Sequence, residues 1–433
     1  MHIQDLQNFY ITLDSQFNVT NNELTNATYS KVDSNFVYSA KYARHRWFNY
    51  KEGFSPVLVD KIFNENKLTS KAIVCDPFCG AGTTLAVAKA CGMQSIGFEV
   101  NPFAAFITKV KTNNYLDSDK ELVLSYLYQL ENISLDTNIE LPQNDYLCRI
   151  FSPDMLIAEL NIRAFLRSLP VCNANDLLYF AWLCTLENAS LYRKAGNGLK
   201  LKTKPPVYDD AFSFALGLIK NKLDAIIEDF SISNNGPIPK VIVDSATTMS
   251  ESINEESVDL VLFSPPYANC FDYTKIYYLE LWFGGFIDSA KEQKDIRMKS
   301  IRSHCHATWP ARYQDFYLPE LNDDLLPLLR QQKLWTSRIP DMLNGYFADM
   351  TETLRLIYKS LKKGGCCDIV VSNSAYAGII IPTDVLLAKI ACQLGFSVKE
   401  IQVERLIITS SQQYKKTESI RKYLRESIVK LEK

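Results

Sequence analysis

A turn with two glycines in residues 74–84, "VCDPFCGAGTT", is the first candidate for ligand binding. An apolar run ends just before it, and Gly80 and Gly82 allow the backbone to turn tightly ahead of a helix predicted to start near Thr83. Such a turn offers free N–H groups to an acidic ligand group. It lacks the Gly-Lys-Ser/Thr of a Walker loop and the third glycine of a dinucleotide fingerprint, where Leu85 stands. The candidate residues of this turn are Asp76, Pro77, Phe78, Gly80, Gly82 and Thr83.

Two acidic residues end apolar runs that follow along the chain. Glu99 closes "QSIGFE", where its carboxylate can accept two hydrogen bonds from ribose hydroxyls. Asp244 closes "KVIVD" and can accept a hydrogen bond from an exocyclic amine such as that of adenine. The alternative interpretation is a plain glycine turn and a solvated Glu99, and Asp244 as a single Asp carries no weight alone. A nucleoside ligand without a pyrophosphate fits both acids and the turn.

The stretch "LVLFSPPYANCFDY", residues 260–273, breaks an apolar run with Ser264, Pro265, Pro266 and Tyr267. Prolines fix φ and lack an N–H group, so this loop presents carbonyl acceptors in one held geometry. The hydroxyl of Ser264 and the carbonyl of Pro265 can hold the two hydrogens of a nucleobase amino group, while Tyr267 stacks on the ring. Such a base must be flipped out of a duplex to be reached. The alternative is a strand that simply ends at two prolines.

These residues need a scaffold that brings strand ends together, and the chain supplies short apolar runs that alternate with helical patterns. Nearly continuous apolar runs are typical of strands covered on both faces, and their alternation with helices predicts a parallel α/β sheet. The last two runs have no helical pattern between them, which predicts a terminal antiparallel hairpin. The predicted strands lie within residues 71–78, 94–101, 240–246, 258–266, 366–373, 397–407 and 426–433.

Helix-period segments replace the strand pattern between residue 101 and about residue 239, which predicts a helical insertion in the α/β core. We therefore expect three parts along the chain. Residues 1–112 hold an N-terminal segment and the first half of the core, residues 113–239 the insertion, and residues 240–433 the second half with the Ser-Pro-Pro-Tyr loop.

The composition is that of a globular protein, because 47% of the 433 residues are hydrophobic. The 47 Lys and Arg against 49 Asp and Glu leave a formal charge of -2, so a polyanion must be met by local patches. The first thirty residues lack a basic n-region and an apolar h-region, and no apolar run approaches a membrane span, so we expect a cytoplasmic protein. His304, Cys305 and His306 have no paired CxxC beside them, so we expect no metal site.

The motifs together resemble one family, the amino-methylating DNA methyltransferases, which use S-adenosylmethionine to methylate the exocyclic nitrogen of cytosine or adenine. "DPFCGAG" is similar to their FxGxG cofactor motif and "SPPY" to their (D/N/S)PP(Y/F/W) catalytic motif. Residues 45–56, "HRWFNYKEGFSP", are similar to the segment that precedes the first strand in this family and packs on the methionine end of the cofactor. The resemblance covers roughly residues 40–112 and 240–433, and only the pair of motifs is specific for methyl transfer.

This resemblance implies a Rossmann-like, seven-stranded methyltransferase sheet of α/β class that binds S-adenosylmethionine at its carboxyl edge. It places Glu99 at the ribose, Asp244 at the adenine, and the glycine turn at the methionine part. The expected cofactor-binding residues are Asp76, Pro77, Phe78, Gly80, Gly82, Thr83, Glu99 and Asp244. The residues expected to hold the target amine are Ser264, Pro265, Pro266 and Tyr267.

The serine at the first catalytic position is similar to the cytosine-N4 enzymes, whereas Asp or Asn is commoner among the adenine-N6 enzymes. We therefore expect a site-specific methyltransferase that acts on N4 of a flipped cytosine in double-stranded DNA, with a cognate restriction or defence-system partner as a further expectation. The alternatives are an adenine-N6 DNA methyltransferase, an RNA base methyltransferase, and a non-catalytic DNA-binding protein of the same fold. A protein glutamine methyltransferase would be expected to carry Asn-Pro-Pro-Tyr.

Two further segments are candidates for DNA contact, beside the helical insertion. Residues 192–206 carry five basic residues and no acid, which predicts a mobile basic loop suited to phosphates, against the alternative of a merely solvated loop. In the segment 269–344, rich in aromatic residues and Arg, the candidates are Arg302 and Arg312. Residues 273–285 have aromatic residues and leucines at helical spacing, which predicts core.

Overall fold

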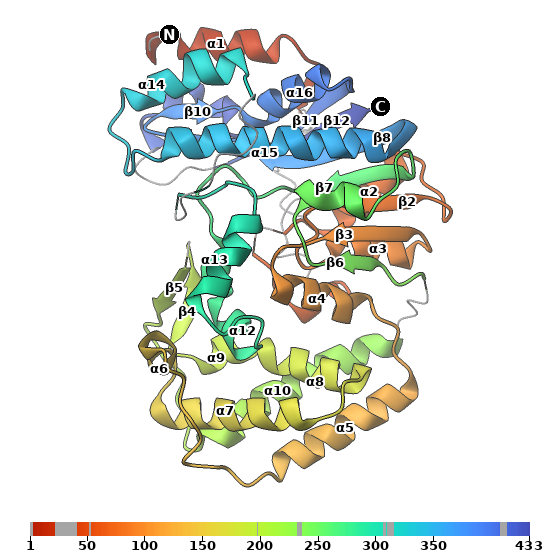
Figure 1. The fold of residues 1–433 in the computed structure, drawn as a ribbon, viewed down its shortest axis with the longest axis vertical. Helices are drawn as coiled ribbons and strands as arrows, with labels where there is room; N and C mark the ends of the chain where they lie inside the picture. Colours follow the sequence, from red (N-terminus) through yellow and green to blue (C-terminus); the bar gives the residue numbers. More distant parts are fainter. Residues whose placement is uncertain are drawn as a thin grey trace.

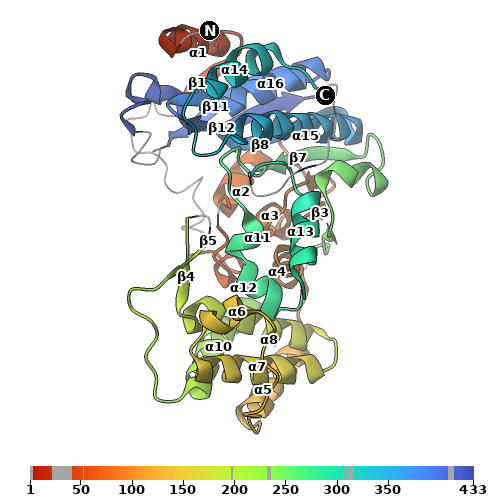
Figure 2. The same ribbon diagram turned by 60° about the vertical axis from the view of Figure 1, so that its left-hand side comes forward.

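The molecule has two parts, a β-sheet covered by helices and a second group that consists mainly of helices (Figure 1). The computed structural model describes residues 3–21, 41–51, 53–196, 198–231, 236–305, 309, 316–407 and 414–433. Figure 1 shows the large β-sheet with its covering helices in the upper part and a group of helices in the lower part. Figure 2 shows the same division after a turn of 60°. This is the α/β class that the alternating strand and helix patterns predict.

The main sheet has eight strands within the described residues, in the order β1-β11-β12-β8-β7-β2-β3-β6. All neighbours pair in parallel except β12, which is antiparallel to both β8 and β11. The carboxyl ends of β2, β3, β6 and β7 therefore meet at one edge. The strands are β1 (Val19–Asn21), β2 (Ile73–Asp76), β3 (Gln94–Phe98), β6 (Lys240–Ile242), β7 (Val258–Phe263), β8 (Leu361–Ser372), β11 (Ser397–Leu406) and β12 (Arg425–Glu432).

The sheet has one strand more than the seven predicted, because β1 pairs in parallel with β11 at the edge. The residues of β1 come from the polar, Asn-rich beginning of the chain, and none of them is buried. Pairing at an edge rests on main-chain hydrogen bonds, so no apolar run has to mark such a strand in the sequence.

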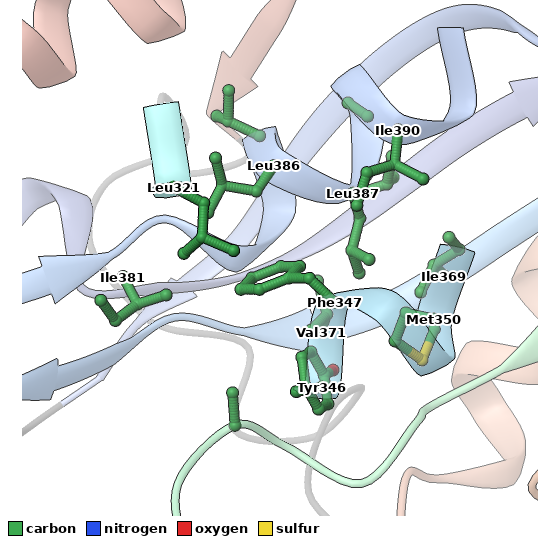
Figure 3. Packing of buried hydrophobic residues seen from close by; sticks show 14 of the residues in the cluster. Leu321, Tyr346, Phe347, Met350, Ile369, Val371, Ile381, Leu386, Leu387 and Ile390 are labelled. Atoms are coloured by element: carbon green, nitrogen blue, oxygen red, sulfur yellow. The ribbon is translucent and has the colours of Figure 1, made fainter. Parts of the chain in front are cut away.

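Both faces of the sheet are covered, which accounts for the continuous apolar runs. In β7, Val261 and Phe263 join the cluster on the side of α15 and α16, whereas Leu260 and Leu262 join the cluster on the side of α2 and α3. Figure 3 shows side chains of α15, β8 and α16 gathered in the first cluster. The helices of this part are α1 (Leu6–Asp14), α2 (Pro56–Glu65), α3 (Thr83–Ala90), α4 (Pro102–Thr112), α14 (Leu326–Arg330), α15 (Ile339–Ser360) and α16 (Thr383–Gln393).

Shorter elements join these parts of the core. The hairpin of β9 (Ser374–Tyr376) and β10 (Ile379–Ile381) follows β8 and pairs antiparallel. The 3-10 helices and the one π-helix of the described chain are η1 (Ile3–Asp5), η4 (His45–Trp47), η5 (Asp229–Ser231), η6 (Ala246–Glu251), η8 (Glu418–Tyr423) and the π-helix η7 (Glu320–Leu325).

Helix α4 begins where the sequence places a capping residue before a proline. Oδ1 of Asn101 accepts the N–H of Phe103 at 3.0 Å, and Pro102 occupies the first position of the helix. Because α4 starts directly after β3, this cap also fixes the backbone of Glu99 at the carboxyl edge of the sheet.

The lower group in Figures 1 and 2 consists mainly of helices from residues 117–228. Its core also holds Trp47 and Phe103 from the first part of the chain and Phe283 from the last part, so the group is packed onto the sheet. The predicted boundaries at residues 113 and 239 stay a prediction. The elements of this group are α5 (Asp117–Glu131), α6 (Asp145–Ile150), α7 (Pro153–Ser168), α8 (Asn173–Leu183), α9 (Leu186–Ala189), β4 (Tyr192–Ala195), β5 (Gly198–Leu201) and α10 (Ala211–Glu228).

Three short helices follow the Ser-Pro-Pro-Tyr loop and connect it to the lower group: α11 (Tyr273–Ile276), α12 (Tyr278–Phe283) and α13 (Ala290–Lys299). Ile276, Leu281 and Phe283 are fully buried, so the prediction that residues 273–285 are core is confirmed. Helix α12, which carries Leu281 and Phe283, packs against α9 and α4.

The longest of the described helices, α15, covers the sheet with one side only. Its buried side carries Leu343, Phe347 and Leu354, while Arg355 and Lys359 are exposed on the other. Among the described residues, no helix is long and apolar enough to cross a membrane.

Candidate active site

A cavity opens at the carboxyl edge of the sheet, between the strand ends and α13. It encloses about 1000 Å³, including space that is open to solvent. The predicted site residues in its wall are Pro77, Phe78, Gly80, Thr83, Glu99, Asp244, Ser264 and Pro266. Those that lie outside the wall are Asp76, Gly82, Pro265 and Tyr267. The structure thus brings both predicted motifs to one cavity.

The glycine turn after β2 is held from within the protein. Gly80 and Gly82 have left-handed φ angles of +50° and +74°, and a Cβ on Gly82 would lie 2.5 Å from Cγ2 of Thr108. The N–H of Gly80 donates to Oε2 of Glu99 at 2.9 Å, and the N–H of Gly82 donates to the carbonyl of Cys79 at 2.6 Å. The prediction that the turn leaves its N–H groups free is therefore wrong for these two glycines, because the protein supplies their acceptors.

Asp76 lies beneath the turn and not in the cavity wall. Its side chain is buried, and Oδ1 accepts the N–H of Phe78 at 3.0 Å. Burial raises the pKa of Asp76 to about 7. This carboxyl group therefore shapes the turn that carries Gly80 into the wall.

Glu99 and Asn101 present an acceptor and a donor side by side in the cavity wall. Oε2 of Glu99 accepts the N–H of Gly80, and Oε1 accepts the N–H of Asn101 at 2.8 Å. Each carboxylate oxygen has a further lone pair for a ligand. Burial raises the pKa of Glu99 to about 7. Asn101 is buried, and its Nδ2 has no hydrogen-bond partner among the described residues.

Asn101 was not singled out in the sequence, although its place before Pro102 predicts a helix cap at the end of a strand. Its Oδ1 caps α4, which leaves the amide hydrogens for another partner. A buried donor without a partner is unfavourable, so this amide points to a ligand acceptor.

Asp244 lies at the cavity next to a lysine of α13. Nζ of Lys299 is 3.4 Å from Oδ1 of Asp244, with 56% and 36% of the two side chains exposed. Such an exposed ion pair is weak, so Asp244 stays available to a ligand amine. Lys299 was not singled out, because one lysine in the charged segment 290–299 carries no distinguishing signal.

The Ser-Pro-Pro-Tyr loop leaves the carboxyl end of β7, and its side chains diverge. Ser264 lines the cavity, whereas the hydroxyl of Tyr267 reaches β12 and donates to Oε1 of Glu426 at 2.9 Å. Oγ of Ser264 lies 3.4 Å from Oη of Tyr267. Oη of Tyr376 donates to the carbonyl of Ala268 at 2.6 Å. Tyr267 and Tyr376 therefore anchor the loop to β12 and to the β9–β10 hairpin.

Tyrosines that the sequence did not single out form part of the cavity wall. Tyr50 and Tyr273 line it, and the ring of Tyr50 stacks on that of Tyr277, with centroids 5.1 Å apart and planes at 13°. A Cβ on Gly80 would lie 3.0 Å from Cε1 of Tyr50. Tyr50 therefore lies directly against the glycine turn.

The two arginines predicted to contact DNA have different outcomes. Arg302 is buried, and its Nη2 and Nε lie 2.8 Å and 3.0 Å from the carboxylate oxygens of Asp349, so this prediction is wrong. The sequence could not show that a carboxylate of α15 takes up this charge. Arg312 and His306 lie outside the described residues. His304 is buried, and the described part of the chain contains no group of three metal-ligating side chains.

Within the predicted mobile basic loop, Tyr192–Ala195 and Gly198–Leu201 form the antiparallel hairpin β4–β5. Lys194 is buried and pairs with Glu280 of α12 and, at 3.4 Å, with Glu187. Nζ of Lys202 donates to backbone carbonyls, among them that of Ser190 at 2.8 Å. The sequence prediction missed these contacts, because a run of basic residues does not show which carboxylates and carbonyls elsewhere in the chain will pair with it. The basic residues of the segment that stay exposed are Arg193, Lys200 and Lys204.

The family model and the relatives that match this chain are all described as DNA methylases or type II methyltransferases. A family model described as DNA methylase matches residues 17–110, from before β1 to α4. The type II methyltransferase M.AvaI from Nostoc sp. is 27% identical, with 93% of this chain and 88% of that protein covered. M.BsoBI from Geobacillus stearothermophilus is 28% identical, with 90% and 85% covered, and M.MvaI from Kocuria varians is 22% identical, with 81% and 82% covered. The similarity to M.AvaI and M.BsoBI thus extends over most of each chain.

Proposed function

The chain belongs to the amino-methylating DNA methyltransferase family, and we propose that it transfers a methyl group from S-adenosylmethionine to the exocyclic N4 of cytosine in DNA. The observation that carries this proposal is the shared cavity. Ser264 of one motif lies in the same wall as Gly80 and Glu99 of the other. An amine held at Ser264 therefore faces a ligand held at Glu99, which is the arrangement that a transfer between them needs.

The cavity has the donors and acceptors that fit S-adenosylmethionine. Glu99 accepts and Asn101 donates, which matches the ribose hydroxyls, since each hydroxyl does both. Asp244 can accept from the adenine amine, and the close contact of Gly80 with Tyr50 borders the place of the methionine part. When bound, this cofactor supplies a methyl group on a positively charged sulfur.

The residues of the Ser-Pro-Pro-Tyr loop hold and orient the target amine. Ser264 Oγ and the carbonyl of Pro265 accept its two hydrogens, which turns the nitrogen lone pair toward the cavity. Tyr267 packs beside the ring of the flipped base and offsets part of the cost of unstacking. Because the transfer is an in-line displacement, alignment and exclusion of water are the main contributions of these residues.

The choice of cytosine rests on Ser264, because serine at this position is similar to the cytosine-N4 members of the family. We further propose a site-specific enzyme of type II that acts beside a restriction or defence-system partner. M.AvaI and M.BsoBI carry the name type II methyltransferase, and both are similar to most of this chain.

The hairpin β4–β5 is the proposed contact to the phosphates of double-stranded DNA. Strand β5 packs against α11, which follows the Ser-Pro-Pro-Tyr loop. The exposed cations Arg193 and Lys200 therefore lie on a hairpin that packs against the helix after the catalytic loop, and Lys204 follows β5 in the chain. Phosphate contacts of this kind position a duplex without reading its sequence.

Incubation with methyl-labelled S-adenosylmethionine and plasmid DNA, followed by mass analysis of the nucleosides, tests this function. We expect N4-methylcytosine. N6-methyladenine would show that adenine, and not cytosine, is the target base. Methyl transfer to RNA but not to DNA would contradict a DNA methyltransferase. Cofactor binding without transfer to either nucleic acid would show a non-catalytic protein.

A further inference from the structure

A line of polar side chains runs from the cavity into the sheet. Oγ of Ser264 lies 3.4 Å from Oη of Tyr267, which in turn lies 2.9 Å from Oε1 of Glu426. Glu426 is buried on β12, and its Oε2 pairs with Nε of Arg405, the residue opposite it on β11. Because Glu426 also lies opposite Ser372, Tyr267 reaches across the carboxyl end of β8.

The carboxylate at the end of this line sets the direction of its hydrogen bonds. An ionised carboxylate only accepts, so the hydroxyl hydrogen of Tyr267 points to Glu426. The oxygen of Tyr267 then accepts from Ser264, so the hydroxyl hydrogen of Ser264 points to Tyr267. The contact of 3.4 Å is long for an O–H···O bond, so its effect is to orient the hydroxyl more than to stabilise the fold.

We propose that Glu426 is a positioning residue, which acts through Tyr267 to make Ser264 a hydrogen-bond acceptor for the target amine. This inference rests on the proposed function, because it is there that Ser264 receives the amine. A serine hydroxyl rotates and can either donate or accept, whereas an amino group that is to be methylated must donate its hydrogens to the site. With its own hydrogen held by Tyr267, Ser264 presents only lone pairs to the cavity.

The same reasoning explains why a serine at the first position of this motif needs an oriented hydroxyl, whereas an Asp or Asn there does not. The Asp or Asn of the (D/N/S)PP(Y/F/W) pattern carries an oxygen that accepts whatever its neighbours do. Serine has no such oxygen, so the neighbour that takes its hydrogen decides its role. In this chain that neighbour is Tyr267, and Glu426 decides the role of Tyr267.

A purely structural anchor of the loop offers a matched control. Oη of Tyr376 donates to the carbonyl of Ala268 at 2.6 Å, beside the same motif. Tyr376→Phe removes the hydrogen bond to Ala268 and the contact of Oη with Sγ of Cys270 at 3.6 Å, and it leaves the line from Ser264 to Glu426 in place. Glu426→Gln keeps the shape of the side chain and removes its charge, so a packing role alone would leave the transfer rate unchanged.

The first measurement needs no turnover. In protein labelled with ¹³C at the tyrosine Cζ positions, the Tyr267 resonance is assigned by its absence in the Tyr267→Phe variant. We expect Glu426→Gln to shift this resonance and Tyr376→Phe to leave it in place. A Tyr267 resonance that does not respond to Glu426→Gln would overturn the inference.

The second measurement is single-turnover methyl transfer with saturating DNA and cofactor. We expect Tyr267→Phe and Glu426→Gln each to slow the transfer about tenfold, the loss typical of a hydrogen bond to a charged group. The double variant should be no slower than the slower single variant, because both changes break one line. Glu426→Gln and Tyr376→Phe should instead combine multiplicatively, and cofactor and DNA affinities should stay within about twofold in all variants.

Unchanged rates, or multiplicative effects of Tyr267→Phe and Glu426→Gln, would overturn the inference. If Glu426→Gln does not fold, the comparison of Tyr267→Phe with Tyr376→Phe decides, and equal rates would count against the proposal. If the wild-type protein transfers no methyl group to DNA while the Tyr267 resonance still responds to Glu426→Gln, then the proposed function fails and the line of hydrogen bonds stands.

Discussion

The N–H of Gly80 donates to Oε2 of Glu99 at 2.9 Å, and this bond ties the glycine turn after β2 to the end of β3. One carboxylate thus holds the backbone of the turn and borders the cavity at the same time. Burial raises the pKa of this group to about 7, so its two tasks depend on pH in the neutral range.

Cofactor affinity should therefore rise with pH up to about 7 and then level off. Only ionised Glu99 has lone pairs on both oxygens for ribose hydroxyls while it still accepts from Gly80 and Asn101. Below this pKa we expect the Kd for S-adenosylmethionine to increase by up to about tenfold per pH unit. Isothermal titration between pH 5.5 and 8.5 measures it. Glu99→Gln should bind about tenfold more weakly at pH 8 and lose the pH dependence; a flat wild-type profile would speak against Glu99 as the ribose ligand.

The free energy of unfolding should fall as pH rises from about 4.5 to about 7. The pKa values of Asp76 and Glu99 are raised to about 7 in the folded protein, so the native state holds these protons more tightly than the unfolded chain does. Their contribution is complete below the unfolded values and is lost as pH approaches 7. Urea denaturation at pH 5 and 7.5 checks this, and Glu99→Gln should reduce the difference. If the free energy of unfolding changes equally between pH 5 and 7.5 in the wild type and in Glu99→Gln, then Glu99 does not cause the pH dependence.

Gly82→Val should destabilise the fold and abolish cofactor binding. The left-handed φ of +74° strains any side chain, and a Cβ would lie 2.5 Å from Cγ2 of Thr108. Together these effects should cost about 2 to 5 kcal/mol in the free energy of unfolding. Urea denaturation and titration with S-adenosylmethionine measure both losses. Gly217→Ala in α10 is the control, since no atom lies near its Cβ position, and it should stabilise by about 0.5 to 1 kcal/mol.

Pro266→Ala and Tyr267→Ala should each reduce methyl transfer at least about a hundredfold, because a misplaced or unstacked target base is no longer aligned. Cofactor affinity should change little, since the residues proposed for the cofactor lie at or after the carboxyl ends of β2, β3 and β6. Transfer from labelled cofactor and titration with cofactor separate the two effects. Tyr128→Ala in α5, where the ring is 68% exposed, is the control. Full activity of Tyr267→Ala would contradict the assignment of the catalytic loop.

The triple variant Arg193→Ala, Lys200→Ala and Lys204→Ala changes two residues of the hairpin and one that follows it. This variant should bind duplex DNA more weakly and with a smaller salt dependence. Each lost phosphate contact lowers the slope of log Kd against log salt by about 0.9. Fluorescence anisotropy over a salt series measures affinity and slope, and cofactor binding should be unchanged. The control removes three exposed lysines near the amino edge of the sheet, namely Lys67, Lys71 and Lys363. Equal losses in both triple variants would show that the hairpin is not the DNA contact.

The strands of the core could be predicted because each is covered on both faces and therefore reads as an apolar run. All seven predicted runs overlap a strand of the main sheet, although β8 begins five residues before its predicted run. The eighth, β1, and the hairpin β4–β5 have no such signal, since their residues are half-exposed or exposed. Main-chain pairing and contacts from other elements hold these strands, and neither leaves a pattern in the local sequence.

The sequence by itself determined which candidate residues lie at the carboxyl edge of the sheet, because Gly80, Glu99, Asp244 and Ser264 each follow the end of an apolar run. Only the tertiary structure decided which polar and charged side chains are already paired within the protein. Arg302 is taken up by Asp349, Lys194 by Glu280 and the hydroxyl of Tyr267 by Glu426. These partners lie 47, 86 and 159 residues apart, so their pairing depends on how strands and helices pack and not on local sequence.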